Sequence, residues 1–289
     1  MNIFLKIFII FKNEGLKSLL ERSISFFIRN TFLDSHFNKE VESKKLIEQL
    51  TSMKIYKTNL SLTRIGPKND SGYLLPENLD DIDYCISPGV GDAFEFEINL
   101  KKKWNIQSLL IDGTLKKSLE DKIRNLNEFK FINKNLSNKD TKNQISFSTI
   151  LKSFENKKLM LQMDIEGSEY NILNNISESH LKRFNYIVIE FHDFDQIKKN
   201  LLNKKIFGII DKINKYFTLI HIHPNNCCDV FKVSSINIPN VFEATYVNNS
   251  LINFKKLEKL NFPHPEDSPN LSYKKEILLD NFFYNGKSN

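Results

Sequence analysis

The segment from Leu159 to Leu173 shows a sharp change in its hydrophobic pattern. A largely apolar run ends in two carboxylates, Asp164 and Glu166, and after Gly167 the apolar positions recur at helical spacing. A short apolar run followed by a helix is typical of a buried strand in an α/β sheet, where polar side chains at the carboxyl edge meet ligands. Acidic residues at this place also cap the next helix. This segment alone leaves both interpretations open.

Upstream of this segment, strand-like and helix-like patterns alternate. We predict strands at 83–87, 107–111 and 129–133, helices at 92–103, 115–126 and 147–154, and a hairpin across 64–76. Strand, helix, strand, helix, strand at this spacing predicts a parallel, doubly wound sheet.

The alternation continues downstream. We predict helices at 168–176 and 194–214, and strands at 183–191, 216–223 and 241–247. No helical pattern separates the last two strands, so the last strand is expected to return antiparallel. The fold class is therefore α/β and Rossmann-like: a seven-stranded, mostly parallel sheet with an antiparallel last strand, preceded by N-terminal helices.

Three regions of the 289-residue chain differ in pattern. We expect an N-terminal helical leader at 1–58, the sheet domain at 59–248, and at 249–289 an extended arm that packs on the same domain. Residues 16–29 alternate basic and apolar positions as an amphipathic helix does. This helix either packs on the domain or makes a peripheral membrane contact through residues 1–30. The apolar run at 3–11 is too short to span a bilayer, which takes about 20 residues.

Composition is that of an ordinary globular protein, with 40% hydrophobic and 26% charged residues, and this excludes a disordered chain. The net charge of +6 comes without a compact basic tract, so no nucleic-acid partner is expected. Cys85, Cys227 and Cys228 show neither zinc-site spacing nor a disulfide framework. A cytoplasmic location is therefore expected, with the inner membrane face as a place of peripheral contact.

A glycine turn follows the first of the predicted parallel strands, in Ser87-Pro-Gly-Val-Gly-Asp. Gly89 and Gly91 let the backbone approach a ligand, and the helix that follows offers free N–H groups. Asp112 closes the next strand, about 20 residues beyond the first glycine. An acidic residue at that distance hydrogen-bonds ribose hydroxyls in Rossmann-like nucleotide sites.

Taken together, these patterns resemble the class I S-adenosylmethionine-dependent methyltransferases, and specifically the FkbM-type methyltransferases. The specific match is Met163-Asp-Ile-Glu-Gly-Ser-Glu-Tyr-Asn-Ile-Leu, which is similar to that family's K-x-D-x-E-G-x-E signature. Further matches are the glycine turn at Ser87, Asp70-Ser-Gly-Tyr, His221-Ile-His-Pro-Asn-Asn, Glu243-Ala-Thr-Tyr-Val and Asp267-Ser-Pro-Asn. The resemblance spans residues 60 to the end, with two departures. Ser87 stands where many methyltransferases have an acidic residue, and Gln162 where this family more often has lysine.

The resemblance implies an O-methyltransferase that uses S-adenosylmethionine (SAM) and acts on a small molecule or glycan. A hydroxyl of a sugar in a surface polysaccharide is the expected acceptor. The implied cofactor-binding residues are Ser87, Gly89, Gly91, Asp112, Asn135 and Asp164. The implied acceptor-binding residues are His221, His223, Asn225 and Asn226.

Asp164, Glu166, Glu190 and His192 end adjacent strands in this topology, so their side chains are expected to converge as the catalytic group. Methyl transfer to a hydroxyl needs a base, and the ordinary pKa of His192, about 6.5, suits neutral pH better than that of Asp164, about 3.9. Asp164 then orients His192, or acts itself if a neighbouring carboxylate raises its pKa. The oxygen-and-imidazole composition also suits a divalent metal, and purely structural hydrogen bonding is the third interpretation.

A different class of function is a Rossmann-like binding or scaffold protein with a decayed cofactor site. Ser87 and the missing third glycine favour this alternative. A nucleic-acid methyltransferase is disfavoured because Asp164-Ile-Glu-Gly replaces the usual Asn/Asp-Pro-Pro-Tyr/Phe motif and no basic groove is evident. The sequence leaves open whether a divalent metal is used, which molecule is the acceptor and what the oligomeric state is.

Overall fold

The structure is a computed structural model that describes residues 40–91, 94–126 and 129–285. The predicted amphipathic helix at 16–29, and with it the membrane contact through residues 1–30, lies outside the described residues. Within the described ranges, no helix combines the length and the apolar character needed to cross a membrane.

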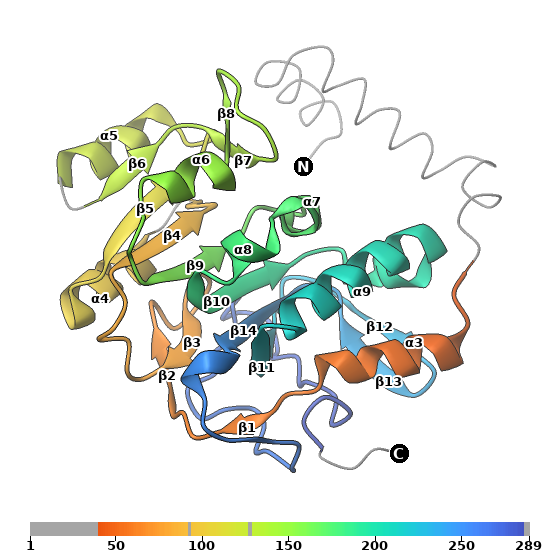
Figure 1. The fold of residues 1–289 in the computed structure, drawn as a ribbon. Coiled ribbons are helices and arrows are strands. Elements are labelled where there is room, and N and C mark those ends of the chain that lie inside the picture. The colour runs from red at the N-terminus through yellow and green to blue at the C-terminus, as the bar shows by residue number, and fades with distance from the viewer. Residues whose placement is uncertain (1–39, 92–93, 127–128, 286–289) are drawn as a thin grey trace.

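A seven-stranded sheet runs through the molecule (Figure 1). In order across the sheet its strands are β11 (Phe217–Pro224), β14 (Phe242–Asn248), β10 (Phe184–Phe191), β9 (Leu159–Met163), β4 (Tyr84–Pro88), β5 (Gln107–Ile111) and β6 (Lys130–Ile132). The strands from β10 to β6 pair in parallel. β14 pairs antiparallel with both β10 and β11. The predicted seven strands and the antiparallel return are confirmed.

A second hairpin, β12 (Val230–Val233) with β13 (Ile236–Pro239), lies between β11 and β14 in the chain, and the sequence pattern did not predict it. Its two-residue turn contains Ser234 at φ +54°. Turns of this kind are normally recognised by Asn-Gly or Asp-Gly, which favour positive φ. The serines at this turn carry no such signal.

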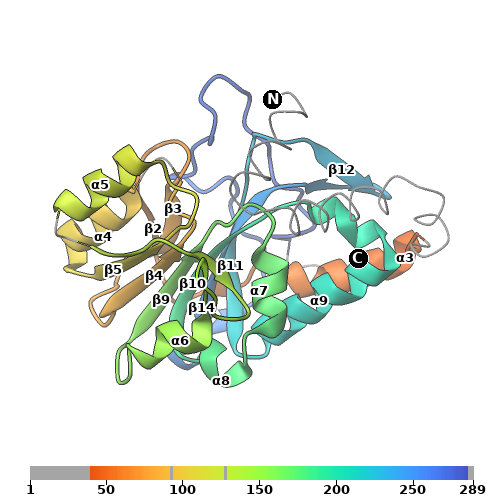
Figure 2. The same cartoon turned by 90° about the horizontal axis from the view of Figure 1, so that it is seen from above.

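Helices cover both faces of the sheet (Figure 2). α4 (Glu95–Trp104) and α5 (Lys117–Leu126) lie on one face; α3 (Ser43–Leu50), α6 (Phe147–Lys152), α7 (Glu169–Asn175), α8 (Glu178–Leu181) and α9 (Asn200–Asn214) lie on the other. The predicted helical region at 194–214 is divided into a 3₁₀ turn at Phe194–Lys198 and α9, because Lys199 between them is extended.

The strand β9 contributes to both apolar layers of the core. Leu161 and Met163 join the larger cluster, which also contains residues of α6, α7 and α9, whereas Met160 joins the cluster of Phe96 and Leu100 on α4. Successive side chains of a strand point to opposite faces. The strand is thus buried on both faces, which explains its nearly continuous apolar sequence.

The predicted hairpin at 64–76 is confirmed as β2 (Leu62–Ile65) and β3 (Tyr73–Pro76), which pair antiparallel. Tyr73 packs edge-on against Phe96 of α4, with ring centroids 5.2 Å apart. The hairpin therefore covers the α4 face of the sheet, beside the carboxyl ends of the central strands.

The segment after β14 lies against the sheet domain. β15 (Lys255–Lys256) pairs with β1 (Lys57–Thr58), and Leu279 and Phe283 are buried in the larger core cluster. Residues 257–285 otherwise run without strands or helices. We call residues 257–285 the C-terminal arm.

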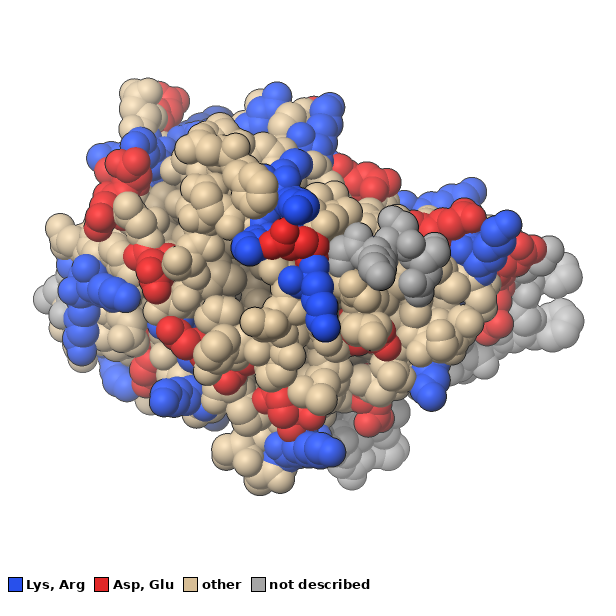
Figure 3. All heavy atoms as spheres, turned by 90° about the horizontal axis from the view of Figure 1, so that it is seen from below, with Lys and Arg blue, Asp and Glu red and all other residues tan. Residues whose placement is uncertain are grey.

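Basic and acidic side chains are interspersed over the face of the molecule seen from below (Figure 3). Ion pairs between exposed side chains, such as Lys215 with Glu178, 3.0 Å apart, occur on the surface of the molecule. Such pairs contribute about 0–1 kcal/mol each. On this face, therefore, the positive net charge does not gather into one patch.

Candidate active site

A cavity of about 1210 Å³ opens beside the carboxyl ends of β4, β5 and β9. Its size is sufficient for a cofactor of nucleoside type together with part of a second substrate. The segments that line it are the tip of the β2–β3 hairpin, the glycine turn after β4, the start of α4, residues 111–114, residues 135–144 and residues 162–172.

The two glycines of the turn are required for different reasons. Gly89 has φ +86°, and a Cβ on it would lie 1.4 Å from the carbonyl oxygen of Asp164. Gly91 has φ +60°, but a Cβ there would meet nothing within 4 Å. Gly89 thus allows close packing of two backbones, whereas Gly91 only provides a conformation that other residues adopt at a cost.

Asp112 and Asn135 line the same cavity as the glycine turn. Asp112 Oδ2 accepts a hydrogen bond from Val90 N at 3.2 Å, and its Oδ1 accepts one from Thr114 N at 2.7 Å. These bonds hold the turn and the strand end together. Thr114 Oγ1 also donates to Asp112 Oδ1, at 2.7 Å. A carboxylate has about four acceptor positions, so Asp112 keeps about one, on Oδ2, for a ligand hydroxyl.

Ser87 is fully buried and does not line the cavity. Its Oγ lies within hydrogen-bond distance of Glu97 Oε1 and 2.7 Å from Gln162 Oε1. Gln162 Nε2 donates to Tyr73 Oη at 3.1 Å, which sets the amide so that its oxygen faces Ser87. The single Ser87 proton serves one acceptor at a time. When Ser87 donates its proton to Gln162, a hydrogen bond between Ser87 and Glu97 forms only if Glu97 is protonated and donates to the Ser87 oxygen.

Glu97 of α4 was missed by the sequence reasoning. Its side chain is 4% exposed, yet it lines the cavity. Burial raises the pKa of Glu97 to about 7, and the hydrogen bond with Ser87 opposes this rise. The signal was present in the departure at Ser87: the acidic group missing from the end of β4 is supplied instead by the first turns of the following helix.

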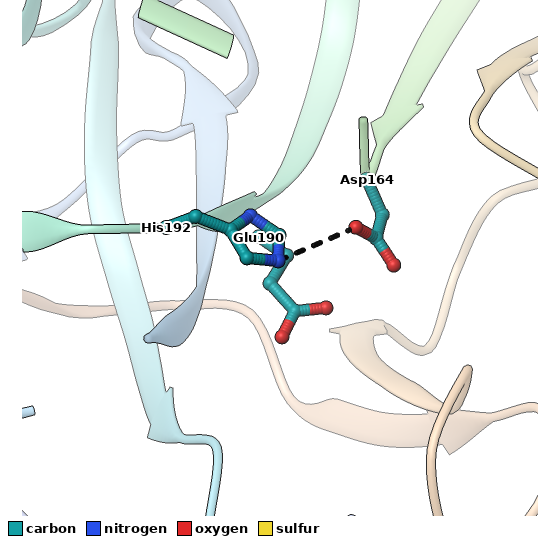
Figure 4. A group of neighbouring side chains, drawn as sticks. All are labelled: Asp164, Glu190 and His192. Carbon is teal, nitrogen blue, oxygen red and sulfur yellow. Dashed lines mark ion pairs between the residues drawn. The ribbon is translucent and has the colours of Figure 1, made fainter. Parts of the chain in front are cut away.

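Asp164, Glu190 and His192 point toward one another at the ends of β9 and β10 (Figure 4). One ligand atom of each lies within 4.8 Å of the other two, and His192 Nε2 is 3.8 Å from Asp164 Oδ1. Glu190 is 3% exposed and accepts a hydrogen bond from Asn225 Nδ2 at 2.6 Å. The strand topology predicted this convergence, and the structure shows it.

Glu166 extends the cluster toward solvent. Its side chain is 87% exposed, lines the cavity, and places Oε2 3.7 Å from His192 Nε2. Glu166 and Gly167 both have positive φ, +54° and +93°. The turn is therefore strained at Glu166, as is common where a backbone presents functional groups.

Glu169, the third acidic residue of the signature segment, was also missed. It is completely buried, and its Oε1 accepts hydrogen bonds from Ile165 N at 3.0 Å and Gly167 N at 3.2 Å. The same oxygen lies 3.3 Å from His192 Nδ1. Glu169 thus fixes both the turn that carries Glu166 and the orientation of the imidazole.

These features match a known family. The model of the methyltransferase FkbM domain matches residues 49–219. The chain belongs to the FkbM methyltransferase family. Its sheet order and antiparallel strand give it the class I methyltransferase fold.

Among curated proteins, no match to this FkbM methyltransferase was found. Solved structures similar to it include an rRNA methylase from Streptococcus thermophilus, with 11% identity, a TM-score of 0.34, and coverage of 59% of this chain and 89% of that chain. The 23S rRNA methyltransferase ErmE is 8% identical, with a TM-score of 0.33 and coverage of 74% and 70%. The bifunctional kinase-methyltransferase WbdD is 11% identical, with a TM-score of 0.32 and coverage of 58% and 35%.

The charges around the FkbM signature shift the ionisation of its residues. Burial raises the pKa of Asp164 to about 7; the charge of His192 opposes this rise, and the charges of Glu166 and Glu169 add to it. Burial and the charge of Asp164 raise the pKa of Glu190 well above its ordinary value. The two carboxyl groups therefore disfavour each other's charged form.

The pKa of His192 is raised, whereas burial alone would lower it. Burial lowers the pKa of His192, but the contact and charge of Glu169, together with the charge of Asp164, outweigh burial and raise it to about 9. With this arrangement of charges, His192 carries its proton at neutral pH. The neighbouring carboxylates thus work against the expected role of His192 as the base.

Three of the four expected acceptor-binding residues face the C-terminal arm. His221 Nε2 lies 2.9 Å from Asp267 Oδ1, His223 Nε2 lies 3.1 Å from Glu276 Oε1, and Asn226 Nδ2 donates to Leu271 O at 2.9 Å. None of the three lines the cavity, and neither does Asn225, which supports Glu190. Acceptor binding by these residues of the FkbM methyltransferase stays a prediction.

Proposed function

We propose that this FkbM methyltransferase is a SAM-dependent O-methyltransferase whose acceptor is a sugar hydroxyl of a surface polysaccharide or related glycan. One observation carries the proposal. A single cavity is lined both by the glycine turn with Asp112 and by the carboxylates Asp164 and Glu166. Cofactor-type and acid–base groups therefore face a common space, as transfer between two bound molecules requires.

The residues on the β4–β5 side of the cavity fit SAM. Gly89 and Gly91 line the cavity with backbone where the methionine part of SAM would lie, Asp112 keeps one acceptor position for a ribose hydroxyl, and Asn135 lines the expected adenine side. When bound, SAM supplies an electrophilic methyl group on a sulfonium. Ser87 does not contact the cavity; it supports this region through its contacts with Glu97 and Gln162.

Glu97 adds a contact that the family resemblance did not imply. Its buried carboxyl group lines the cavity beside the glycine turn, and in the described part of the chain no Lys or Arg forms an ion pair with it. The α-ammonium group of SAM is the cation that this position suits. Pairing with the ammonium favours the charged form of Glu97, which burial otherwise disfavours.

On the β9 side, the cavity wall holds the acceptor hydroxyl and takes its proton. As the acceptor oxygen bonds to the methyl carbon, the carbon–sulfur bond breaks and its electron pair stays on sulfur. The hydroxyl proton passes to one of the two carboxylates on the β9 side of the cavity, Asp164 or Glu166. The FkbM segment thus supplies the acceptor side of the reaction.

The sugar acceptor is supported by the polar wall of the cavity around the acceptor region. Hydroxyl and amide side chains that form hydrogen bonds in two directions suit a polyhydroxylated molecule. Beside the signature carboxylates the cavity lining includes Ser168 and Asn171, and the tip of the β2–β3 hairpin adds Asn69 and Ser71.

The test begins with cofactor binding by the full chain. Calorimetric titration with SAM and with S-adenosylhomocysteine is expected to show one site per chain, and absence of binding would overturn the proposal. Surface glycans from cells with and without the protein are then compared by mass and linkage. A gained methyl ether identifies the acceptor and its position.

The alternative is a Rossmann-like binding protein with a decayed cofactor site. Ser87 is the observation that favours it, but Glu97 brings an acidic group back to the same place. A folded chain that binds neither SAM nor S-adenosylhomocysteine at the glycine turn would support this alternative. A cytoplasmic location with residues 1–30 at the inner membrane face is part of the leading proposal, and co-sedimentation with anionic vesicles tests it.

A further inference from the structure

The cluster of Asp164, Glu190 and His192 has features that an acid–base group alone does not need. Asp164 Oδ1 is buried and has no hydrogen-bond partner, although it faces His192 Nε2 at 3.8 Å. Glu190 is 3% exposed, and one of its oxygens is held by Asn225. A buried carboxylate oxygen without a donor is costly unless something supplies positive charge.

The surroundings do not supply enough positive charge. Among the residues that the structure describes, no Lys or Arg forms an ion pair with Asp164 or Glu190, and His192 is the cation that approaches them. Glu169 lies against the other ring nitrogen of His192, so the single positive charge is shared with a further carboxylate. Three buried or half-buried acids thus surround one imidazole.

The side chains are also held in the orientations that a metal site requires. Glu169 Oε1 fixes the Nδ1 side of His192 at 3.3 Å, so that Nε2 faces Asp164, and Asn225 fixes Glu190. Metal-binding histidines typically contact a carboxylate or carbonyl group through the nitrogen that does not bind the metal. Asp164 directly follows β9, Glu190 lies within β10 and His192 directly follows it, so the sheet sets their backbone positions.

We propose that Asp164, Glu190 and His192 bind a divalent first-row cation of the Mn²⁺ type. Two carboxylates and one imidazole form a mixed oxygen and nitrogen set that suits such ions, and the ligand atoms already lie within 4.8 Å of one another. A shift of about 1 Å in each side chain would bring them to coordination distance. Asp164 lines the cavity, whereas Glu190 and His192 lie behind its wall, so a bound cation would meet the acceptor on the Asp164 side.

The role of the cation rests on the proposed function. Two neighbouring hydroxyls of a sugar complete its coordination, and the cation makes the bound hydroxyl more acidic. With Asp164 engaged as a ligand, Glu166 is the carboxylate beside the cluster on the β9 side of the cavity that is left to take the proton. The oxygen then attacks the methyl carbon, and the electron pair of the broken carbon–sulfur bond stays on sulfur.

Metal binding is tested on the full chain after chelator treatment and without any cofactor. Titration with Mn²⁺, followed by the loss of the free-ion electron paramagnetic resonance signal, is expected to show one bound ion per chain. Glu190→Gln and His192→Ala are expected to weaken binding by about tenfold or more. Asp195→Asn, an exposed acid three residues after His192, is the charge-matched control and is expected to bind as the parent does. Circular dichroism of each variant checks that it is folded.

The outcomes separate this inference from the proposed function. A protein that binds SAM and methylates a glycan equally well with and without chelator, and takes up no Mn²⁺, Mg²⁺ or Zn²⁺, overturns the metal site alone. Equal Mn²⁺ affinity of the parent and Glu190→Gln overturns it too, because the ion then lies elsewhere. A protein that binds the cation at this cluster but not SAM keeps the metal site and loses the proposed function.

Discussion

The α-carbon of Gly89 lies so close to the backbone of Asp164 that a Cβ on Gly89 would be 1.4 Å from the Asp164 carbonyl oxygen. Asp164 N in turn donates a hydrogen bond to Pro88 O at 3.2 Å. The glycine turn and the acidic turn are therefore in direct backbone contact. A change that separates the two backbones alters both sides of the cavity at once.

Gly89→Ala is expected to destabilise the fold and to abolish cofactor binding, because the added methyl group cannot fit unless the two turns separate. Gly91→Ala is the matched control, since open space surrounds that position. It is expected to cost only the backbone strain of positive φ, about 1–2 kcal/mol. Urea unfolding and calorimetry with S-adenosylhomocysteine measure both effects. Equal losses in the two variants would contradict the close packing at Gly89.

Glu97→Gln is expected to weaken SAM binding by about tenfold, the effect of losing one hydrogen bond between charged groups. Glu95→Gln alters an exposed acid in the first turn of the same helix that also lines the cavity, and this comparison variant is expected to change affinity less than Glu97→Gln. Isothermal titration calorimetry of both variants gives the comparison. If Glu95→Gln has the larger effect, the ammonium contact lies at the rim of the cavity and not at Glu97.

The affinity for SAM is expected to depend on pH through the same residue. The pKa of Glu97 is raised by burial to about 7, so its carboxyl group is protonated below that pH and ionised above it. The ammonium of SAM prefers the ionised form. Affinity is therefore highest above about pH 7 and falls toward about pH 5. Glu97→Gln is expected to remove this dependence, and a slope that persists in the variant would assign it to another group.

Because of His223, the free energy of unfolding is expected to decrease as the pH becomes alkaline. Burial lowers the pKa of His223, but its ion pairs with Glu243 and Glu276 outweigh burial and raise it to about 10. The pKa of this histidine is about 6.5 in the unfolded chain and about 10 in the folded protein. Its contribution to the free energy of unfolding is therefore fully present below about pH 6.5 and is lost as the pH rises through about 10. Urea unfolding between about pH 6 and about pH 10 is expected to show this decline.

His223→Gln tests this assignment. The variant leaves Glu243 buried without its cationic partner, which typically costs about 3–5 kcal/mol. It is also expected to flatten the loss of stability above neutral pH. His180→Gln, at a partly exposed position on α8, is the control and is expected to keep the parent's pH dependence. A parent-like profile in His223→Gln would show that another group titrates.

The fold was largely predictable because its signals are local. Runs such as the one ending at Met163 are nearly continuous in apolar residues, and each is followed by a recognisable helical pattern. The β12–β13 hairpin was not predictable, because the serine turn at Ser234 lacks the residues that normally favour positive φ.

The candidate site was predictable only where strand ends determine it. Asp164 and His192 come together because β9 and β10 are parallel neighbours. The departure at Ser87 indicates that an acidic group is missing from β4, but it does not identify Glu97 as the replacement, since that role depends on which face of α4 meets Ser87. His221 finds its partner Asp267 46 residues later in the chain, a pairing that no local pattern encodes. Even the charge of His192 depends on Glu169, whose orientation is set by the turn around it.

The C-terminal arm has a consequence for biosynthesis. It supplies partners to three buried polar side chains of β11 and β14: Asp267 contacts His221, Asn270 donates to Glu243, and Glu276 contacts His223. A nascent chain that has emerged only as far as β14 therefore lacks these arm contacts: His221 has no Asp267 to pair with, and His223 keeps only Glu243. This side of the sheet reaches its final form only after the arm has left the ribosome, so a chaperone that binds apolar surface has its longest opportunity at β11 and β14.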